Sequence, residues 1–591
     1  MSGYAVELIS EEWFFNAGLI GLKRLYPDEL PIINGNPAIT VDMLDTLAER
    51  YFHYLFSTYN IAERDAKRMQ NLLSWAEKNE RDAFKEISRF AAEQLKKIDK
   101  YFPTQAVELK RVIDVMKKPE SIEQMKVYVD KYLKIVTSEE INQKLTINYV
   151  KSLYISPFYG QTSFLQKTFS AMTYDTHLKR MIKDFIEPAR LEITFAELLQ
   201  SAKSEEEIKD FLEKHKDYSG FKGWLKAIKK MKLSDTHQWF HENLLPCSFI
   251  DSLYATMNFE EMMFLPLGIS RTNATNFFYD FNKINPIPMS AVARLILFLF
   301  PIGATFYNRQ VGHGTAKETR RYAGIVLNST RFADNYDANE TYRNIRNEGG
   351  SFTDAVFGVL ADVKQKAERS QRSLLFIEVH TDGSKKTVLD YYHMPAYASK
   401  YFSSNQSNAL RVLFLKEEKD QFIRSILNGR DPKQEMFRYV REAIKNATHR
   451  TGALVMVQQR AKIMRVKKGV NEEMDEKQDK QIYVIYKQGI ALQKRLEGKT
   501  NTETHDVYRA DASKKIQGIA YRLLNSLKTG NPDSFLDTIM RLHVGVGLPV
   551  SSLFLDVLKK GGLDFETIGG AFIAGLLGEE YKEKPIGEEA K

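Results

Sequence analysis

The sequence is poor in cysteine, since its 591 residues include one thiol, Cys247. A single thiol cannot form an intramolecular disulfide, so an oxidising compartment would give the fold no cross-link. His237 and His241 lie four residues apart and close to Cys247 in sequence, but a fourth zinc ligand is not evident. We therefore predict no metal site and interpret Cys247 as a small buried hydrophobe.

The sequence also lacks a long uninterrupted hydrophobic run. Its longest apolar block, Leu295 to Tyr307, contains a proline and a glycine and is shorter than the roughly 20 residues that a membrane helix needs. The N-terminus carries Glu7, Glu11 and Glu12 before Lys23, which is unlike the basic start of an export signal. We predict a cytoplasmic protein without a membrane partner.

Recognisable catalytic motifs are absent from the sequence. It contains neither a G-x-S-x-G nucleophile elbow nor a phosphate-binding loop, and the glycine spacing in "VGHGTAKE" (Val311 to Glu318) is wrong for such a loop. The acidic residues form no nuclease or hydrolase pattern. We predict no catalytic residues and no cofactor, and an enzyme that acts on nucleic acid through an unrecognised set of acids stays open as an alternative.

The composition is that of a globular protein. Apolar residues make up 43% of the chain, charged residues make up 27%, and the formal net charge is +9. A length of 591 residues predicts two to four folding units. A modest positive charge permits a polyanionic partner if the cations gather on one face.

Hydrophobic periodicity predicts a mainly α fold with a smaller α+β portion. A large N-terminal α+β domain is expected over 1–466, with successive helices over 41–150. A unit over about 303–395 contains short β-branched and aromatic runs, and "TDGS" (Thr381 to Ser384) between two of them indicates a hairpin. An amphipathic helix is expected between its strands.

The C-terminal part of the sequence reads as a helical bundle. Four or five amphipathic helices joined by short turns are expected over 481–591. The preceding segment, 467–480, is polar and charged, and we predict that it is a linker.

The N-terminal stretch "EEWFFNAGLIGL" (Glu11 to Leu22) predicts a short buried helix. Trp13 and Phe14 are expected in the core, and Gly18 and Gly21 would allow a neighbouring element to approach closely.

Two kinds of sequence feature suggest contacts with nucleic acid. Five cations within nine residues, without an acid among them, are candidates for phosphate contacts, and a solvated basic face is the equally weighted alternative. These residues are Arg460, Lys462, Arg465, Lys467 and Lys468.

Two segments combine small polar residues with aromatics, as backbone that approaches a duplex would require. Ordinary structural loops share this composition. The candidates in the first, Ser156 to Lys167, are Gly160, Gln161, Thr162, Ser163 and Lys167. Those in the second, Gly268 to Phe278, are Arg271, Asn273 and Asn276.

Three segments that span the sequence are informative together, in their order along the chain. They are "WFFNAGLIGL" near the start, "INPIPMSAVARLILFLFPIGATFY" (Ile284 to Tyr307) and "SKKIQGIAYRLLNSLKTGNPDSFLDTIMRL" (Ser513 to Leu542). In this order they resemble the large subunit of a type I-B CRISPR Cascade effector complex. Many members of that family carry two C-x-x-C pairs for zinc, which this chain lacks. The resemblance therefore carries no metal over to this sequence and leaves a divergent branch open.

The resemblance implies a binding subunit of an RNA-guided surveillance complex. Such a subunit recognises the motif beside a DNA target, stabilises the R-loop and recruits a separate helicase–nuclease, while guide RNA reads the target by base pairing. The implied partners are guide RNA, target DNA, and the backbone and small subunits of Cascade. Met464 or Met474 would be a suitable internal start for a separate small subunit. A helical scaffold that binds only protein is the remaining alternative.

Overall fold

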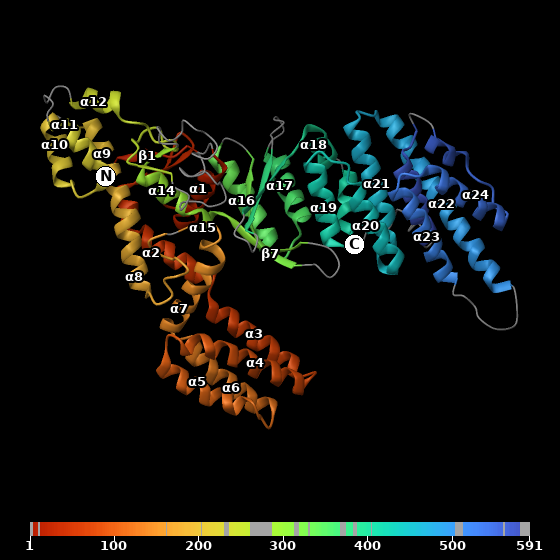
Figure 1. The fold of residues 1–591 in the computed structure, drawn as a ribbon, viewed down its shortest axis with the longest axis horizontal. Coiled ribbons are helices and arrows are strands. Elements are labelled where there is room, and N and C mark those ends of the chain that lie inside the picture. Colours follow the sequence, from red (N-terminus) through yellow and green to blue (C-terminus); the bar gives the residue numbers. More distant parts are fainter. Residues whose placement is uncertain are drawn as a thin grey trace, which may run out of the picture.

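The computed structural model describes residues 4–9, 12–160, 162–201, 204–229, 236–259, 287–311, 318–328, 331–366, 374–381, 387–403, 405–502, 512–558 and 562–578. The fold is mainly α with a minor α+β portion, as the sequence predicts. The molecule is elongated, with a four-stranded sheet near its middle and a helical lobe that projects from one side (Figure 1).

The N-terminal body surrounds the buried helix α1 (Trp13–Leu25). The strands that flank α1 in the sequence form a small antiparallel sheet of order β1-β3-β2. These strands are β1 (Ala5–Glu7), β2 (Ile32–Ile33) and β3 (Asn36–Thr40). The body also contains the helices α2 (Val41–Thr58), α8 (Tyr174–Met181), α9 (Glu187–Ser201), α14 (Ala291–Phe298) and α15 (Phe300–Gly303).

Helix α1 approaches α14 and α15 through glycine. A Cβ atom on Gly18 would overlap the carbonyl oxygen of Ile296, and one on Gly21 would crowd the carbonyl oxygen of Leu299. Trp13 and Phe14 are buried against Phe300. The predicted core helix with a closely packed neighbour is therefore confirmed.

The helical lobe contains α3 to α6 and has its own hydrophobic core. Helix α7 joins it to the N-terminal body, because Ile141 belongs to the core of the lobe and Val150 to the core of the body. Successive helices over 41–150 are confirmed. Their bounds are α3 (Ile61–Ala76), α4 (Glu80–Asp99), α5 (Pro103–Met116), α6 (Ile122–Val136) and α7 (Glu139–Val150).

The central sheet has the order β6-β7-β8-β9 and is antiparallel throughout. Helices α16 (Phe332–Asn347) and α17 (Phe352–Lys366) lie between its second and third strands in sequence. The predicted pairing of the last two strands is confirmed, since Thr381 pairs with Thr387, although the turn lies outside the described residues. The strands are β6 (Thr305–Val311), β7 (Glu318–Leu327), β8 (Leu375–Thr381) and β9 (Thr387–His393).

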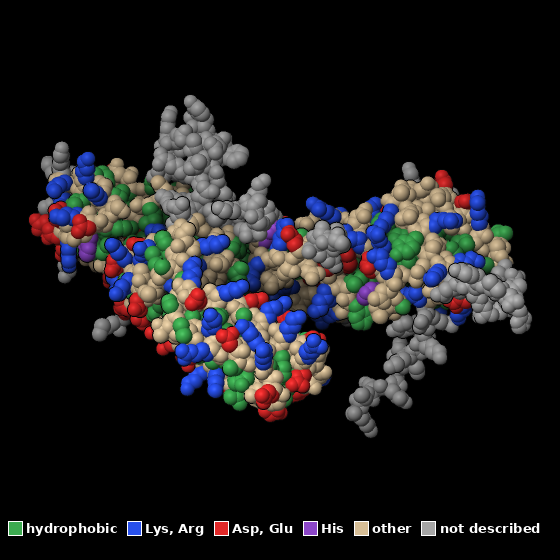
Figure 2. Space-filling model, turned by 60° about the horizontal axis from the view of Figure 1, so that its bottom comes forward, with side chains coloured by type: hydrophobic (Ala, Val, Ile, Leu, Met, Phe, Trp, Pro, Cys, Tyr) green, Lys and Arg blue, Asp and Glu red, His purple; other side chains and the backbone are tan. Residues whose placement is uncertain are grey.

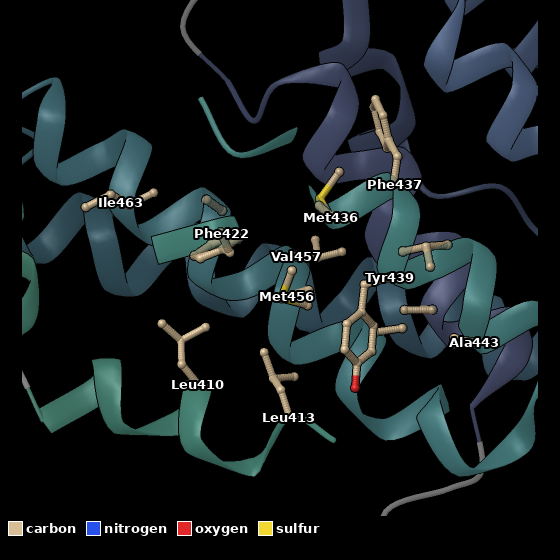
Figure 3. Packing of buried hydrophobic residues seen from close by; sticks show 14 of the residues in the cluster. Leu410, Leu413, Phe422, Met436, Phe437, Tyr439, Ala443, Met456, Val457 and Ile463 are labelled. Atoms are coloured by element: carbon tan, nitrogen blue, oxygen red, sulfur yellow. The ribbon is translucent and has the colours of Figure 1, made fainter. Parts of the chain in front are cut away.

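The C-terminal half shares one large hydrophobic core with one face of the central sheet. Phe422, Met436, Met456 and Val457 belong to this core, and their side chains project from neighbouring helices in Figure 3. The helices from α18 to α21 are α18 (Ala396–Ser403), α19 (Lys416–Leu427), α20 (Lys433–Lys445) and α21 (Arg450–Lys467).

In the described part of the predicted bundle, four α-helices and one 3-10 helix are present. They are α22 (Glu472–Thr502), α23 (Ala512–Lys528), α24 (Pro532–Val546), η10 (Ser552–Leu558) and α25 (Phe565–Leu577). Helix α25 packs against α20 and α21 as well as against α22 and α23. The bundle and the helices that precede it therefore form one packed unit.

The segment predicted as a linker, 467–480, is mostly helical. Residues 472–480 form the first turns of α22, and the joint after α21 is a short turn at Gly469 with φ +70°. Asp475 and Asp479 form ion pairs with cations on α21. The polar composition of this segment thus reflects a charged contact between α21 and α22. A solvated linker has the same composition, so the sequence alone does not distinguish the two.

In the described part of the chain, no helix combines the length and apolarity that crossing a membrane requires.

We predict that Gly18→Ala destabilises the protein. The added methyl group would force α1 away from α14, and overpacking of this kind costs about 1–3 kcal/mol. Thermal unfolding of the purified variant should show a lower melting temperature than the wild type.

The matched control is Gly518→Ala on α23. Gly518 is an exposed helical residue with nothing within 4 Å of an added Cβ, so alanine should stabilise the helix by about 0.5–1 kcal/mol. An unchanged melting temperature for Gly18→Ala beside this control would contradict the proposed close packing of α1.

Candidate nucleic-acid interface

A basic cavity of about 510 Å³ lies where the helical lobe meets the N-terminal body. Helices α3, α4 and α7 and the π-helical turn Lys151–Ile155 provide its walls. We call it the basic cavity. Its lining residues are Ile61, Arg64, Gln94, Lys96, Lys97, Lys100, Tyr101, Leu145, Asn148, Tyr149, Ser152 and Leu153.

The amphipathic pattern of α4 places its lysines at the cavity. Ile87, Ala91 and Ile98 are buried in the core of the lobe, while Lys96 and Lys97 are exposed in the last turn. Cations at a helix C-terminus are favoured by the partial negative charge of its free carbonyl groups. The helix therefore holds these lysines toward solvent at little cost in stability.

Two tyrosines stand among these cations. The Arg64 guanidinium lies 4.6 Å from the centre of the Tyr149 ring, and Lys100 Nζ lies 5.3 Å from that of Tyr101. Burial by itself raises the pKa of Tyr149, but a hydrogen bond with Arg321 and the charges of Arg321 and Arg64 bring its pKa below the ordinary value. Tyr149 is therefore in contact with two guanidinium groups that favour its ionised form.

The described residues that line the cavity include four Lys or Arg residues and no Asp or Glu. One of these cations, Arg64, forms an ion pair of 3.4 Å with Asp65, which lies outside the lining and is 1% exposed. Burial raises the pKa of Asp65 against the effect of that guanidinium. Figure 2 shows Lys and Arg side chains around the hollow between the helical lobe and the rest of the molecule. Such a surface can attract the phosphates of a nucleic acid.

Buried cations bind the backbone of residues 169–172, which follow the loop predicted to contact a duplex. Lys151 Nζ donates to the carbonyl oxygen of Phe169 at 2.8 Å, and Lys144 Nζ donates to that of Met172 at 2.6 Å. Lys144 Nζ also lies 4.9 Å from the ring of Tyr101, which lines the basic cavity. Residues 169–172, which follow the C-terminal end of the loop, are therefore adjacent to the cavity.

Burial and the repulsion between neighbouring cations lower the pKa values of Lys151 and His177. Burial, followed by the charge of Lys144, lowers the pKa of Lys151 to about 8. Burial, followed by the charge of Lys151, lowers the pKa of His177 to about 3. The backbone N–H of Leu165 donates to His177 Nδ1 at 3.2 Å, which requires that this nitrogen is unprotonated.

The predicted residues of this loop differ in their surroundings. Thr162 is buried and donates to the carbonyl oxygen of Phe164 at 2.6 Å, while the carbonyl oxygen of Ser163 accepts from Arg180. Gly160 is half-buried and Lys167 is exposed. Thr162 thus maintains the shape of the loop, and Lys167 is available at its surface. Four other candidates, Gln161, Arg271, Asn273 and Asn276, lie outside the described residues.

The predicted cation run on α21 consists largely of residues in internal ion pairs. Arg460 is 2% exposed and bonds to Asp431 and Asp564. Lys462 and Arg465 both pair with Asp475. The sequence run lacks acids, but the fold brings acids to it from α22, from the joint between α19 and α20 and from the residue before α25. These three side chains have a structural role.

The last two cations of that run are exposed. Lys467 Nζ donates to the carbonyl oxygen of Gly429 at 2.7 Å and lies 5.4 Å from the ring of Tyr397. Lys468 is the C-terminal cap of α21 and is exposed. Contact of Lys467 and Lys468 with a displaced strand or guide complex stays a prediction.

The cavity residues at the C-terminal end of α4 are not among the contacts predicted from the sequence. The segment Lys96 to Tyr101 contains three lysines followed by a tyrosine, which is the local signal that could have indicated them. The other half of the cavity, Arg64 and Tyr149, comes from helices that are separate in sequence. Their meeting depends on tertiary packing and leaves no linear pattern.

In the part of the chain that is described, no group of three or more His, Cys, Asp or Glu side chains could hold a metal ion. Cys247 is buried, and its Sγ accepts hydrogen bonds from the backbone N–H groups of Phe249 and Ser290. The interpretation of Cys247 as a buried side chain is confirmed.

Comparison of the chain with protein-family models, curated proteins and solved structures finds no match.

We predict that Arg460→Ala destabilises the C-terminal half. Removal of a buried arginine leaves Asp431 and Asp564 without their partner, and such a loss costs about 3 kcal/mol. Chemical denaturation followed by circular dichroism should register this change.

Lys468→Ala, eight residues further on and exposed, should change stability by less than about 0.5 kcal/mol. Equal stability of the two variants would show that the ion pairs of Arg460 contribute little to the fold.

Proposed function

We propose that the protein is a nucleic-acid-binding subunit and that the basic cavity is part of its contact surface. The observation that carries this proposal is a concave site whose lining has four cations, two tyrosines and no carboxylate. Attraction of phosphates by cations is independent of base sequence and supplies much of the affinity of nucleic-acid-binding proteins.

The uncharged side chains of the basic cavity could contact the bases and sugars of a nucleic acid. Gln94, Asn148 and Ser152 offer hydrogen-bonding groups next to the lysines. Tyr101 and Tyr149 offer ring surfaces against which a base could stack. Phosphates would contact Lys96, Lys97 and Lys100 at the exposed rim.

The finer proposal is that this subunit is the large subunit of a CRISPR RNA-guided surveillance complex. Its support is the ordered resemblance of three segments, which correspond to α1, to the run through α14, α15 and β6, and to α23 with α24. In this role the protein would act in the cytoplasm, recognise the motif beside a DNA target and stabilise the R-loop. Its partners would be guide RNA, target DNA, other Cascade subunits and a separately recruited helicase–nuclease.

The loop Ser156 to Lys167 is the part of this proposal closest to the basic cavity. Its backbone bonds to Arg180 through the carbonyl oxygen of Ser163 and to His177 through the N–H of Leu165, and Lys167 is exposed. A preformed loop loses little entropy on binding. We propose that the loop contacts the duplex while the cavity contacts phosphates.

The double variant Lys96→Glu, Lys100→Glu should weaken binding to a random-sequence duplex by at least about tenfold at 100 mM salt. Loss of two phosphate contacts should reduce the slope of log K against log salt by about 2, because each contact contributes about 0.9. Fluorescence anisotropy at several salt concentrations measures both quantities.

The control variant Arg81→Glu, Lys85→Glu changes the charge by the same amount on the same helix. Both residues are exposed near the start of α4 and do not line the basic cavity. If both variants weaken binding equally, the net charge and not the cavity determines affinity. Absence of salt-dependent binding by the wild type would favour a protein-only scaffold, and cleavage of the duplex in Mg²⁺ would favour an enzyme.

Co-expression with guide RNA and candidate Cascade backbone subunits tests the finer proposal. The purified complex should enrich a short motif from a duplex library with randomised flanking sequence. Gln161→Ala should abolish that enrichment and retain salt-dependent binding, because bases specify and phosphates position. Failure of the chain to assemble with RNA and backbone subunits would overturn the Cascade role. The proposal of nucleic-acid binding would then depend on the anisotropy measurements alone.

A further inference from the structure

A second cavity, of about 680 Å³, lies at the opposite end of the N-terminal body from the helical lobe. Its walls come from α9, α11 (Ser219–Ile228), α12 (Thr236–Asn243) and the segment 244–254. We call it the aromatic cavity. Its volume is in the range of small-molecule sites, which are usually concave and mostly apolar with a few convergent polar groups.

Four aromatic side chains line the aromatic cavity. The Trp224 ring centre lies 5.4 Å from that of Phe195, 5.9 Å from that of Phe240 and 6.4 Å from that of Tyr254. Phe195 and Phe240 are buried, so their rings are fixed by packing. Aromatic faces carry partial negative charge and attract cations within about 6 Å.

A buried carboxylate, Glu192, also lines the cavity. It is 4% exposed and accepts hydrogen bonds from the backbone N–H groups of Ala291 and Val292 at 2.8 and 3.1 Å and from the hydroxyl groups of Tyr218 and Thr256. Burial raises the pKa of Glu192 to about 7 against the effect of these bonds. A positive charge nearby would relieve the cost of its ionisation.

The exposed acid Asp251 lies at the outer side of the aromatic cavity. Asp251 and Ser252 also line an adjoining cavity of about 250 Å³, together with Glu7 and Glu12. Among the described residues that line the aromatic cavity there is neither Lys nor Arg. The charged side chains of this described lining are therefore opposite in sign to those of the basic cavity.

This lining selects one ligand chemistry. A phosphate or carboxylate would meet carboxylates without a compensating cation, which is unfavourable in a partly desolvated site. A cation with an apolar body would place its charge near Asp251 and Glu192 and its body against Trp224 and Phe240. We propose that the aromatic cavity is a binding site for a small organic cation, specifically an amine with an aromatic or similarly apolar body.

This site is separate from the proposed nucleic-acid contacts. Of the described residues that line the aromatic cavity, none lines the basic cavity or belongs to the loop Ser156 to Lys167. Binding of an amine would thus depend on a different set of residues from binding of a duplex.

Isothermal titration calorimetry of the full chain with three probes of similar shape tests the proposal. The probes are phenethylamine, 2-phenylethanol and 3-phenylpropionate, which are cationic, neutral and anionic at pH 7. We expect phenethylamine to bind at least about tenfold more tightly than 2-phenylethanol, because a hydrogen bond to a charged group contributes more than a neutral one. 3-Phenylpropionate should bind most weakly.

Two exposed positions permit variants that leave the apolar walls intact. Asp251→Asn should weaken phenethylamine binding by about threefold to tenfold and leave 2-phenylethanol unchanged. Gln200→Glu adds an acid to the lining and should strengthen the binding of phenethylamine. Asp217→Asn, which removes an exposed acid outside the cavity, is the matched control and should have no effect.

Three results would overturn the proposal: no saturable binding of phenethylamine below 10 mM, equal affinity for 3-phenylpropionate, or equal effects of Asp251→Asn and Asp217→Asn. Duplex affinity, measured on the same variants, should stay within twofold of the wild type. The two proposed sites can therefore fail independently.

Discussion

Both large hydrophobic cores of the protein depend on one four-stranded sheet. Successive residues of a strand point to opposite faces, so Tyr322 and Val326 belong to the C-terminal core while Ala323 and Ile325 belong to the N-terminal core. Because the same backbone serves both cores, a one-residue slip in register would exchange every one of these side chains. The sheet therefore couples the two halves of the molecule mechanically and energetically. Charges strengthen this coupling: Glu378 on β8 is fully buried and accepts two hydrogen bonds from Arg424 on α19.

The basic cavity is an indirect consequence of this arrangement. Helix α7 connects the helical lobe to the N-terminal body, and its Tyr149 lies between Arg64 of the lobe and Arg321 of the central sheet. The glycine contacts of α1 with α14 and α15 lie in the N-terminal body, whose core also contains Ala323 and Ile325 of the central sheet. The lining of the basic cavity thus comes from the helical lobe, from α7 and from the turn after it, while Arg321 of the central sheet contacts Tyr149 in that lining. Its shape depends on the relative positions of these elements.

The sequence was sufficient for those features that depend on local pattern. Periodicity predicted the helices over 41–150, the paired strands β8 and β9 and the buried α1, because burial of one face imposes a repeat on the residues that form it. It failed for 472–480 and for Arg460, where the deciding partner is distant in sequence. In the sequence alone, a charged segment next to a run of cations has the pattern of a linker beside an exposed basic surface. In the structure, α21 packs against α22, and Asp475 forms ion pairs with Lys462 and Arg465. The basic cavity was missed for the same reason, since no local window contains both Lys97 and Tyr149.

The packing of α25 also bears on the idea of a separately made C-terminal subunit. A product beginning at Met474 would retain α22 to α25 but lack α20 and α21, against which α25 packs in the full chain. It would also separate Asp475 from Lys462 and Asp564 from Arg460. Burial of an apolar face contributes about 25 cal/mol per Å², so exposure of the α25 contact surface would favour association. An independent small subunit of this sequence would accordingly need either a second copy or another protein surface to replace α20 and α21, whereas a start at Met464 would restore Arg465 but still lack Arg460.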